Sequence, residues 1–481
     1  MKPRNVRLLF GSLLLVGSMF VLREASAQPV PSDTPDYTEQ LKKAGELFGK
    51  GDLDGCLKEL QVQAEKTKTL PPARLMLARM LLATNNQQAV QAGRNNLEVV
   101  LTEQPNHPEC YLTNGTIALN EGRLTEAVLN FQAALGLAEQ DTWTAAQKKT
   151  FMRESRAGLA TAFENRRDWP SARTALNGWL VLDEKNGQVR QRLARALFFM
   201  KRPEDALAEL ATAVQNDSKL EPPEVTMGLL FASQEDREKA KEWFEKAIAK
   251  YPAKAKVHQA YGGWLLDTGK LEEAGKHIKE AEKLDPKSRE TLGLLGLQSR
   301  YEGNLTEAEK NFEDCRRLAV SDFFAINQLA LVFIESQDKD KQALGIQYAE
   351  LNAQRFPRNA EALASLGWAY FKSKKYDEAE NILARATSGG QASPDTAFYL
   401  ASVLNHRSKY DEAFKILFSA GKSKGVFVNR KAAAVLYKEL KTKVPADAEE
   451  KLIKEEKEKE APKKSDEPMK DKDEPKKSKQ P

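Results

Sequence analysis

Hydrophobic residues recur at helical spacing along most of this chain, in pairs of amphipathic stretches that return every 34 residues. A glycine or polar turn separates the two stretches of a pair, as at Gly122, Gly269 and Gly303. Each pair therefore predicts a helix hairpin. Successive pairs begin near residues 37, 71, 108, 153, 187, 221, 255, 289, 323, 360 and 394. We expect an all-α fold of about eleven stacked hairpins over residues 37–427.

Two places of each unit hold small residues, which supports the hairpin prediction. A large side chain would hold two crossing helices apart, so a close crossing requires small residues at the contact. The eighth place holds Ala44, Ala78, Gly115, Ala160, Ala194, Gly228, Gly262, Gly296, Ala330, Gly367 and Ala401. The twentieth place, with three extra residues in the second and ninth units, holds Cys56, Gly93, Ala127, Ala172, Ala206, Ala240, Ala274, Ala308, Gly345, Ala379 and Ala413. Bulky residues such as Leu295 and Phe312 fill places 7 and 24, so large side chains are expected to pack against small ones.

These repeating residues resemble the tetratricopeptide repeat, whose pattern has small residues at places 8, 20 and 27 and often proline at place 32. Place 27 is small at Ala134, Ala213, Ala247, Ala281, Cys315, Ala386 and Ala420, and place 32 is proline at Pro105, Pro252, Pro286 and Pro357. Departures from the pattern are Gln63 and Trp179 at place 27 and Lys43 and Asn114 at place 7. The resemblance implies an α-solenoid, a superhelical stack whose first helices line a groove for segments of partner proteins.

An insertion interrupts the spacing between the units at 108 and 153. Its eleven extra residues correspond to about three helical turns. They are therefore expected to lengthen the first helix of the next unit without changing its apolar face. Trp143 and Phe151 lie in this extension, where they either cover an edge of the stack or dock a partner.

The chain on either side of the repeats has a different composition. Residues 28–36 are a short linker, and residues 428–444 predict a capping helix with apolar residues on one side and lysines on the other. The apolar side is formed by Ala433, Leu436, Tyr437 and Leu440. Residues 445–481 are rich in Lys, Glu, Asp and Pro, which predicts a disordered tail, or at most a frayed helix around 449–460.

The N-terminus has the pattern of a secretory signal peptide. Lys2, Arg4 and Arg7 precede an apolar run from residue 8 to residue 22, and small residues surround a cleavage point after Ala27. Residues 1–27 therefore predict an exported, bacterial-type repeat protein in the periplasm or outside the cell. The alternative is an uncleaved segment that anchors the protein in the inner membrane.

Charge and motifs narrow the function further. The 481 residues carry 74 Lys and Arg against 69 Asp and Glu, so the near-balanced charge gives no indication of nucleic-acid binding. The three cysteines are too few for a disulfide scaffold, and Cys56 and Cys315 occupy small-residue places, which favours packing. The sequence has no phosphate loop, nucleophile turn, HExxH motif or dinucleotide fingerprint. We expect no enzymatic activity, catalytic site, metal site or cofactor.

One local cluster resembles a metal or acid–base site. Glu273, His277 and Glu280 share a helix face. Acidic residues recur at the place of Glu273 in other units, where they favour the positive end of a helix dipole. His277 has no counterpart, so the register favours a structural role for the cluster.

The groove that the resemblance implies is lined by places 2, 5, 9, 12 and 13 of the first helices. Carried over place by place, the predicted partner-binding residues are Arg195, Phe198, Phe199, Arg300, Tyr301, Leu331, Ile334, Trp368, Phe371 and Phe398. Trp368, Phe371 and Phe398 either form an exposed aromatic cluster that docks a partner or turn inward and fill the core. No unit has Lys at place 5 with Asn at place 9, the pair that grips a C-terminal carboxylate in some members of the family. We therefore expect an apolar or mixed peptide.

Two functions from different classes fit these observations. The first is an exported scaffold that binds peptide segments of envelope or secreted proteins in its groove. The second is a structural or assembly protein that self-associates. The sequence does not indicate the partner or the oligomeric state, and it predicts membrane association only if the N-terminal segment is not cleaved.

Overall fold

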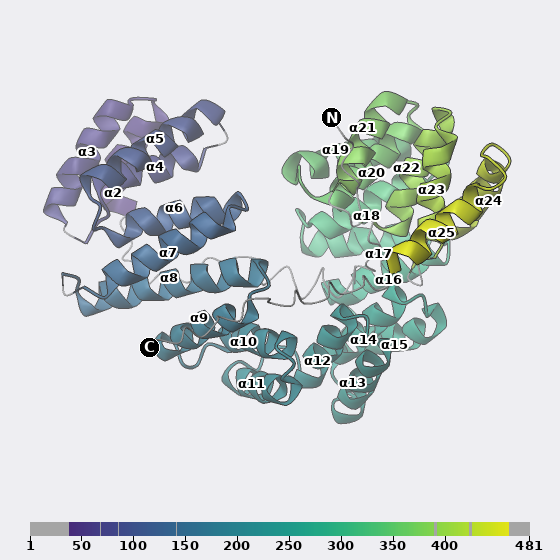
Figure 1. Ribbon diagram of the computed structural model, residues 1–481, viewed down its shortest axis with the longest axis horizontal. Coiled ribbons are helices and arrows are strands. Elements are labelled where there is room, and N and C mark those ends of the chain that lie inside the picture. The colour runs from purple at the N-terminus through teal and green to yellow at the C-terminus, as the bar shows by residue number, and fades with distance from the viewer. Residues whose placement is uncertain are drawn as a thin grey trace, which may run out of the picture. The chain divides into compact units, whose positions relative to one another are not determined.

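The computed structural model describes residues 38–67, 69–84, 86–140, 142–388, 392–422 and 426–460. Within these ranges the chain forms 24 helices and no strand, so the fold is all-α (Figure 1). The predicted signal peptide at 1–27, the linker at 28–36 and residues 461–481 of the tail lie outside the described residues. No helix in the described part combines the length and the apolarity needed to cross a bilayer.

The described helices form two compact units. The N-terminal unit comprises residues 38–265 and 272–286, and the C-terminal unit comprises residues 266–271 and 287–460. The N-terminal unit contains α2 (Thr38–Gly49), α3 (Leu53–Lys66), α4 (Ala73–Leu82), α5 (Gln87–Glu103), α6 (Pro108–Asn120), α7 (Leu124–Ala138), α8 (Ala145–Asn165), α9 (Trp169–Leu182), α10 (Gly187–Phe199), α11 (Pro203–Asn216), α12 (Pro223–Ser233), α13 (Arg237–Lys250) and most of α14 (Ala255–Asp267) and α15 (Leu271–Leu284). The C-terminal unit contains α16 (Arg289–Tyr301), α17 (Leu305–Leu318), α18 (Phe323–Ile334), α19 (Lys339–Arg355), α20 (Ala360–Lys372), α21 (Tyr376–Thr387), α22 (Pro394–His406), α23 (Tyr410–Gly421), α24 (Arg430–Lys441) and α25 (Ala448–Glu460).

Consecutive helices pack as hairpins, as the 34-residue period predicts. In the N-terminal unit α6 packs on α7 and α10 on α11, and in the C-terminal unit α18 packs on α19 and α20 on α21. The first helices of successive hairpins also contact each other. Helix α6 contacts α8, and α18 contacts α20. Within each unit, hairpins such as these therefore contact their sequence neighbours, which is the organisation of an α-solenoid.

Small residues at place 8 permit this packing. A Cβ added to Gly296 would lie 2.5 Å from Cε1 of Phe312, and one added to Gly367 would lie 2.5 Å from Cγ of Leu383. Phe312 and Leu383 are fully buried, so they have little room to move away. The expected packing of a large place-24 side chain against a small place-8 residue is thus present in these hairpins.

The turn between the two helices of a hairpin has a conserved backbone shape across the units. Among the described residues, the one at place 15 has a positive φ in nine units, with values from 57° at Arg167 to 83° at Gly303. Only four of these residues are glycines. The other five are Arg167, Lys201, Glu235, Lys374 and Ser408. The left-handed turn is therefore a property of the hairpin, even where a side chain makes it costly.

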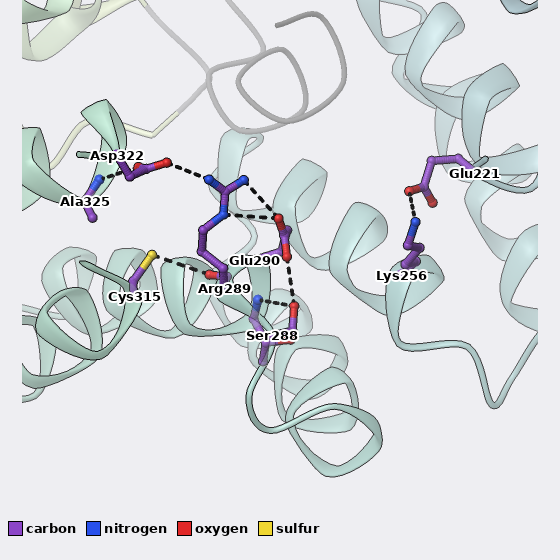
Figure 2. Close-up of polar contacts among 9 residues, drawn as sticks. Glu221, Lys256, Ser288, Arg289, Glu290, Cys315, Asp322 and Ala325 are labelled. Carbon is purple, nitrogen blue, oxygen red and sulfur yellow. Dashed lines mark hydrogen bonds and ion pairs between the residues drawn. The ribbon is translucent and has the colours of Figure 1, made fainter. Parts of the chain in front are cut away.

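Ion pairs join hairpins that are neighbours in sequence. In the N-terminal unit Arg192 pairs with Glu164 at 2.7 Å. In the C-terminal unit Arg289 reaches Asp322 at 2.6 Å and also bonds Glu290, while Asp322 caps α18 through the backbone N–H of Ala325 (Figure 2). These partners lie about one repeat apart, so their register follows the stacking of hairpins.

The three cysteines are free and buried. Burial raises the pKa of the Cys110 and Cys315 thiols to about 12. The thiol of Cys315 donates to the carbonyl oxygen of Arg289 at 3.6 Å (Figure 2). Because thiols with such raised pKa values remain protonated, Cys110 and Cys315 act as small core residues.

The insertion before residue 153 lengthens a first helix, as predicted. Helix α8 has 21 residues and begins at Ala145. Trp143 packs edge-on against Phe151 at 5.3 Å and His107 at 5.0 Å, and its indole N–H donates to the carbonyl oxygen of Leu137 at 2.9 Å. Trp143 and Phe151 thus cover the helices beside the insertion.

The C-terminal unit ends in two helices. The predicted cap corresponds to α24, whose Ala433 and Leu440 are buried. Helix α25 falls in the segment for which the sequence allowed at most a frayed helix, and Ala448 and Leu452 pack against the same core. The cap therefore continues into residues that the composition assigned to the tail.

Candidate partner-binding site

The histidine at the centre of the carboxylate cluster meets a second histidine. His258 on α14 places its Nδ1 atom 3.2 Å from Nδ1 of His277 on α15. The Nε2 atom of His258 lies 2.9 Å from the carbonyl oxygen of Pro252, so Nε2 carries the proton and Nδ1 accepts from His277. Burial lowers the pKa of His277, the charge of His258 adds to this effect, and Glu273 opposes it.

This pair has no further ligand for a metal. Among the described residues there is no group of three or more His, Cys, Asp or Glu side chains that could hold an ion. Glu280 instead pairs with Lys283 at 2.8 Å. Sequence reasoning missed that His258 and His277, at places 4 and 23 of one unit, face each other. Because both places belong to one hairpin, the repeat register could have indicated this contact.

The predicted groove residues of the C-terminal unit are mostly inside. Trp368 is 5% exposed and Phe398 is 6% exposed, and Leu331 and Ile334 are also buried. The indole N–H of Trp368 donates to a carboxylate oxygen of Glu335 at 2.6 Å. These side chains fill the space between first helices, which corresponds to the inward alternative for the aromatic cluster.

The charged member of this set has a partner within the C-terminal unit. Arg300 is buried and donates to Oε1 of Gln328 at 3.1 Å. Tyr301 and Phe371 are half-buried, and Phe371 stacks on Trp368 with ring centroids 5.2 Å apart. Phe371 therefore has the most accessible ring of the three aromatics in the predicted cluster.

The N-terminal unit presents a more open arrangement at the end of α10. Phe198 is buried and packs edge-on against Phe231 at 4.9 Å. Arg195 and Phe199 are half-buried, and Phe199 stacks on the half-buried Trp169 at 4.5 Å with an angle of 17° between the rings. The guanidinium of Arg195 lies 5.9 Å from the Trp169 ring and 5.8 Å from the Phe199 ring.

The structure therefore brings Arg195, Phe198 and Phe199 together, and it adds one residue that the sequence did not single out. Trp169 is the first residue of a second helix, outside the places that line the groove in the family. Packing of α9 against α10 brings it to Phe199. The partner-binding role of all ten predicted residues remains a prediction.

Comparison with known proteins supports the repeat assignment. The family model described as "Tetratricopeptide repeat" matches residues 225–289 and 347–397. No curated protein has a matching sequence.

Similar solved structures include three helical-repeat proteins. Yeast Tom70 is 15% identical, with a TM-score of 0.34, over 87% of this chain and 98% of that one. The Cut9–Hcn1 hetero-tetramer of the APC/C is 12% identical, with a TM-score of 0.37, over 92% and 99%. A thermophilic TPR protein of Thermus thermophilus is 18% identical, with a TM-score of 0.33, over 39% and 98%.

Because these TM-scores are low, the repeat assignment depends on the sequence match and not on these structures. The matched segments lie in the array whose period, small residues and hairpin packing are described above. The chain therefore carries tetratricopeptide repeats over residues 225–289 and 347–397.

Proposed function

We propose that this protein is an exported, non-enzymatic scaffold that binds peptide segments of envelope or secreted proteins along its first helices. Tetratricopeptide repeats are interaction modules, which supports the general role. The sequence of residues 1–27 supports export. The proposal requires no cofactor.

One observation carries the choice of surface. In the N-terminal unit Phe199, Trp169 and Arg195 all remain half-buried, so each keeps surface in contact with solvent. Aromatic and arginine side chains grouped in this way are enriched where proteins bind one another. The corresponding aromatics Trp368 and Phe398 are buried by their own unit and are less suited to contact a partner.

Cross-linking with identification of the captured proteins tests this function. The wild-type protein and a Phe199→Ala variant are compared in the envelope fraction of the source cells. Leu129→Ala is the matched control, since Leu129 is apolar, lies on the second helix α7 and is 61% exposed. We expect Phe199→Ala to lose specific captured proteins and Leu129→Ala to retain them.

Two results would count against the proposal. Identical captured sets for Phe199→Ala and the wild type would remove Phe199 from the binding surface. A stable homo-oligomer in light scattering, without any specific heterologous partner, would favour the self-associating alternative. Export has its own test, because the mature protein in the envelope or medium should begin after Ala27.

A further inference from the structure

Arg195 is a cation that has no acidic partner in the part of the chain that the structure describes. Its neighbour Arg192, one turn earlier on α10, takes both carboxylate oxygens of Glu164 and also donates to Thr161. Within the described ranges, no hydrogen bond or ion pair joins Arg195 to any residue. Glu164 is the carboxylate whose charge acts on Arg195, and it is already committed to Arg192.

The surroundings of Arg195 hold its side chain in place. The guanidinium lies against the Trp169 and Phe199 rings, which stack on each other. Contact with aromatic rings stabilises a cation without using its N–H groups as donors, so the N–H groups of the guanidinium stay free to bind a ligand. Those N–H groups form a planar fork that matches the two oxygens of a carboxylate.

The local charge favours an acidic ligand. Residues 153–202 contain eleven Arg and Lys against five Asp and Glu, although the whole chain is nearly balanced. Partial burial lowers the pKa of Arg195, and the positive charges of Arg192 and Arg167 add to this effect. An incoming carboxylate would relieve this repulsion, and the partial burial would reduce its screening by water.

We propose that Arg195, held against Trp169 and Phe199, binds the carboxylate of an Asp or Glu side chain in a partner's peptide segment. This inference rests on the proposed function and specifies the chemistry of the partner. An apolar residue beside that acidic residue would contact the exposed edges of the Trp169 and Phe199 rings. The partner segment therefore carries an acidic residue with an apolar neighbour.

A protein segment fits this surface better than a nucleic acid. Proteins bind phosphate backbones through rows of cations. The strength of that binding depends strongly on the net positive charge of the protein surface. Here one guanidinium lies beside two stacked aromatic rings, and the chain as a whole is only +5. A single carboxylate satisfies this geometry.

The experiment uses a random-peptide display library, selected in parallel against the full-length wild-type protein, Arg195→Gln and Arg173→Gln. Arg173 is the matched control, because it lies in the same basic region but on the second helix α9. One selected acidic peptide is then synthesised with its Asp or Glu intact and with that residue replaced by the corresponding amide. Dissociation constants are measured by fluorescence anisotropy.

We expect the wild type and Arg173→Gln to enrich Asp or Glu at one peptide position and Arg195→Gln to lose this preference. The amide peptide should bind the wild type about ten- to a hundredfold more weakly than the acidic one, the range of a charged hydrogen-bonded contact. Arg195→Gln should weaken the acidic peptide by a similar factor and leave the amide peptide unchanged. Retained binding of the amide peptide also shows that the variant is folded.

Three results would overturn the inference. The selected peptides could carry no acidic preference, or the acidic peptide could bind Arg195→Gln as tightly as the wild type. Tighter, Arg195-dependent binding of a mixed-sequence single-stranded oligonucleotide would assign the surface to nucleic acid. In contrast, a library that yields no binding peptide on any variant would contradict the proposed function itself.

Discussion

The Nδ1 atoms of His258 and His277 lie 3.2 Å apart across the hairpin of α14 and α15, so one proton is shared between the two rings. A second proton between the two Nδ1 atoms would break the hydrogen bond that joins the rings. Glu273 and Glu280 on α15 and Tyr261 on α14 are the other titratable groups near the pair. The carboxylate of Glu280 is engaged by Lys283, so it offers limited compensation.

This pair predicts a loss of stability in acid. The pKa of His277 is lowered from 6.5 in the folded chain, so below that pH the unfolded chain binds more protons than the folded one. Stability from His277 is therefore complete above about pH 6.5 and decreases as the pH falls, by at most about 1.4 kcal/mol per pH unit for one proton. Solvent at the half-buried ring reduces this value.

Thermal unfolding measures the effect. The scans run from about pH 5 to about pH 8, on both sides of the ordinary histidine pKa of about 6.5. His277→Gln should flatten the pH dependence relative to the wild type. Burial also lowers the pKa of His107, so the informative quantity is the difference between the variant and the wild type. Equal slopes for His277→Gln and the wild type would contradict the shared proton.

The left-handed turns predict opposite effects for two substitutions. Gly122 has φ 75° and open space around its Cβ position, so Gly122→Ala adds only backbone strain. Glu235 has φ 59°, and Glu235→Gly removes that strain. We expect Gly122→Ala to lower the free energy of unfolding by about 1 kcal/mol and Glu235→Gly to raise it by up to about 1 kcal/mol. Urea denaturation measures both, and shifts of the same sign would refute the assignment of strain.

Close packing at place 8 predicts a steric cost. Gly296→Ala should destabilise the C-terminal unit by about 1–3 kcal/mol, because the new methyl group meets the fully buried Phe312. Phe312→Leu should relieve part of the cost in the double variant. Gly136→Ala is the control, since its Cβ position is open and alanine favours a helix. Denaturant midpoints of the wild type, Gly296→Ala, Phe312→Leu and the double variant measure the coupling.

Burial of Trp368 predicts a structural defect from its removal. Trp368→Ala should lower stability by about 3–5 kcal/mol, since it leaves a cavity beside Phe398 and Tyr399 and removes the bond to Glu335. Phe371→Ala should lower stability by a smaller amount, because Phe371 is only half-buried. Calorimetry compares the two variants. A Trp368→Ala protein that melts like the wild type would show that this ring is not part of the core.

The hairpins were predictable from the sequence because their contacts are local. Gly296 and Phe312 are sixteen residues apart, and both follow from the period and the small-residue places. The left-handed φ of Glu235 was not predictable from composition, since the hairpin imposes it on a residue that does not prefer it.

The candidate site was predictable only in part, because its contacts join different hairpins. Trp368 meets Glu335 and Tyr399, each about one repeat away, and its burial depends on how first helices stack. Trp169 reaches Phe199 from a second helix, so place-by-place transfer from the family could not identify it. The place of Arg195 in the repeat identified it as a candidate residue. Its lack of an acidic partner among the described residues depends on the pairing of Arg192 with Glu164.

The ion pairs between neighbouring hairpins have a consequence for how the array comes apart. Arg192 with Glu164, and Arg289 with Asp322, each connect a hairpin only to the one beside it, so within each unit unfolding can start at an end and advance like a zipper. Contacts of such short range also favour rapid refolding. A protein built in this way can lose its terminal hairpins under stress and recover them without rebuilding the rest of the stack.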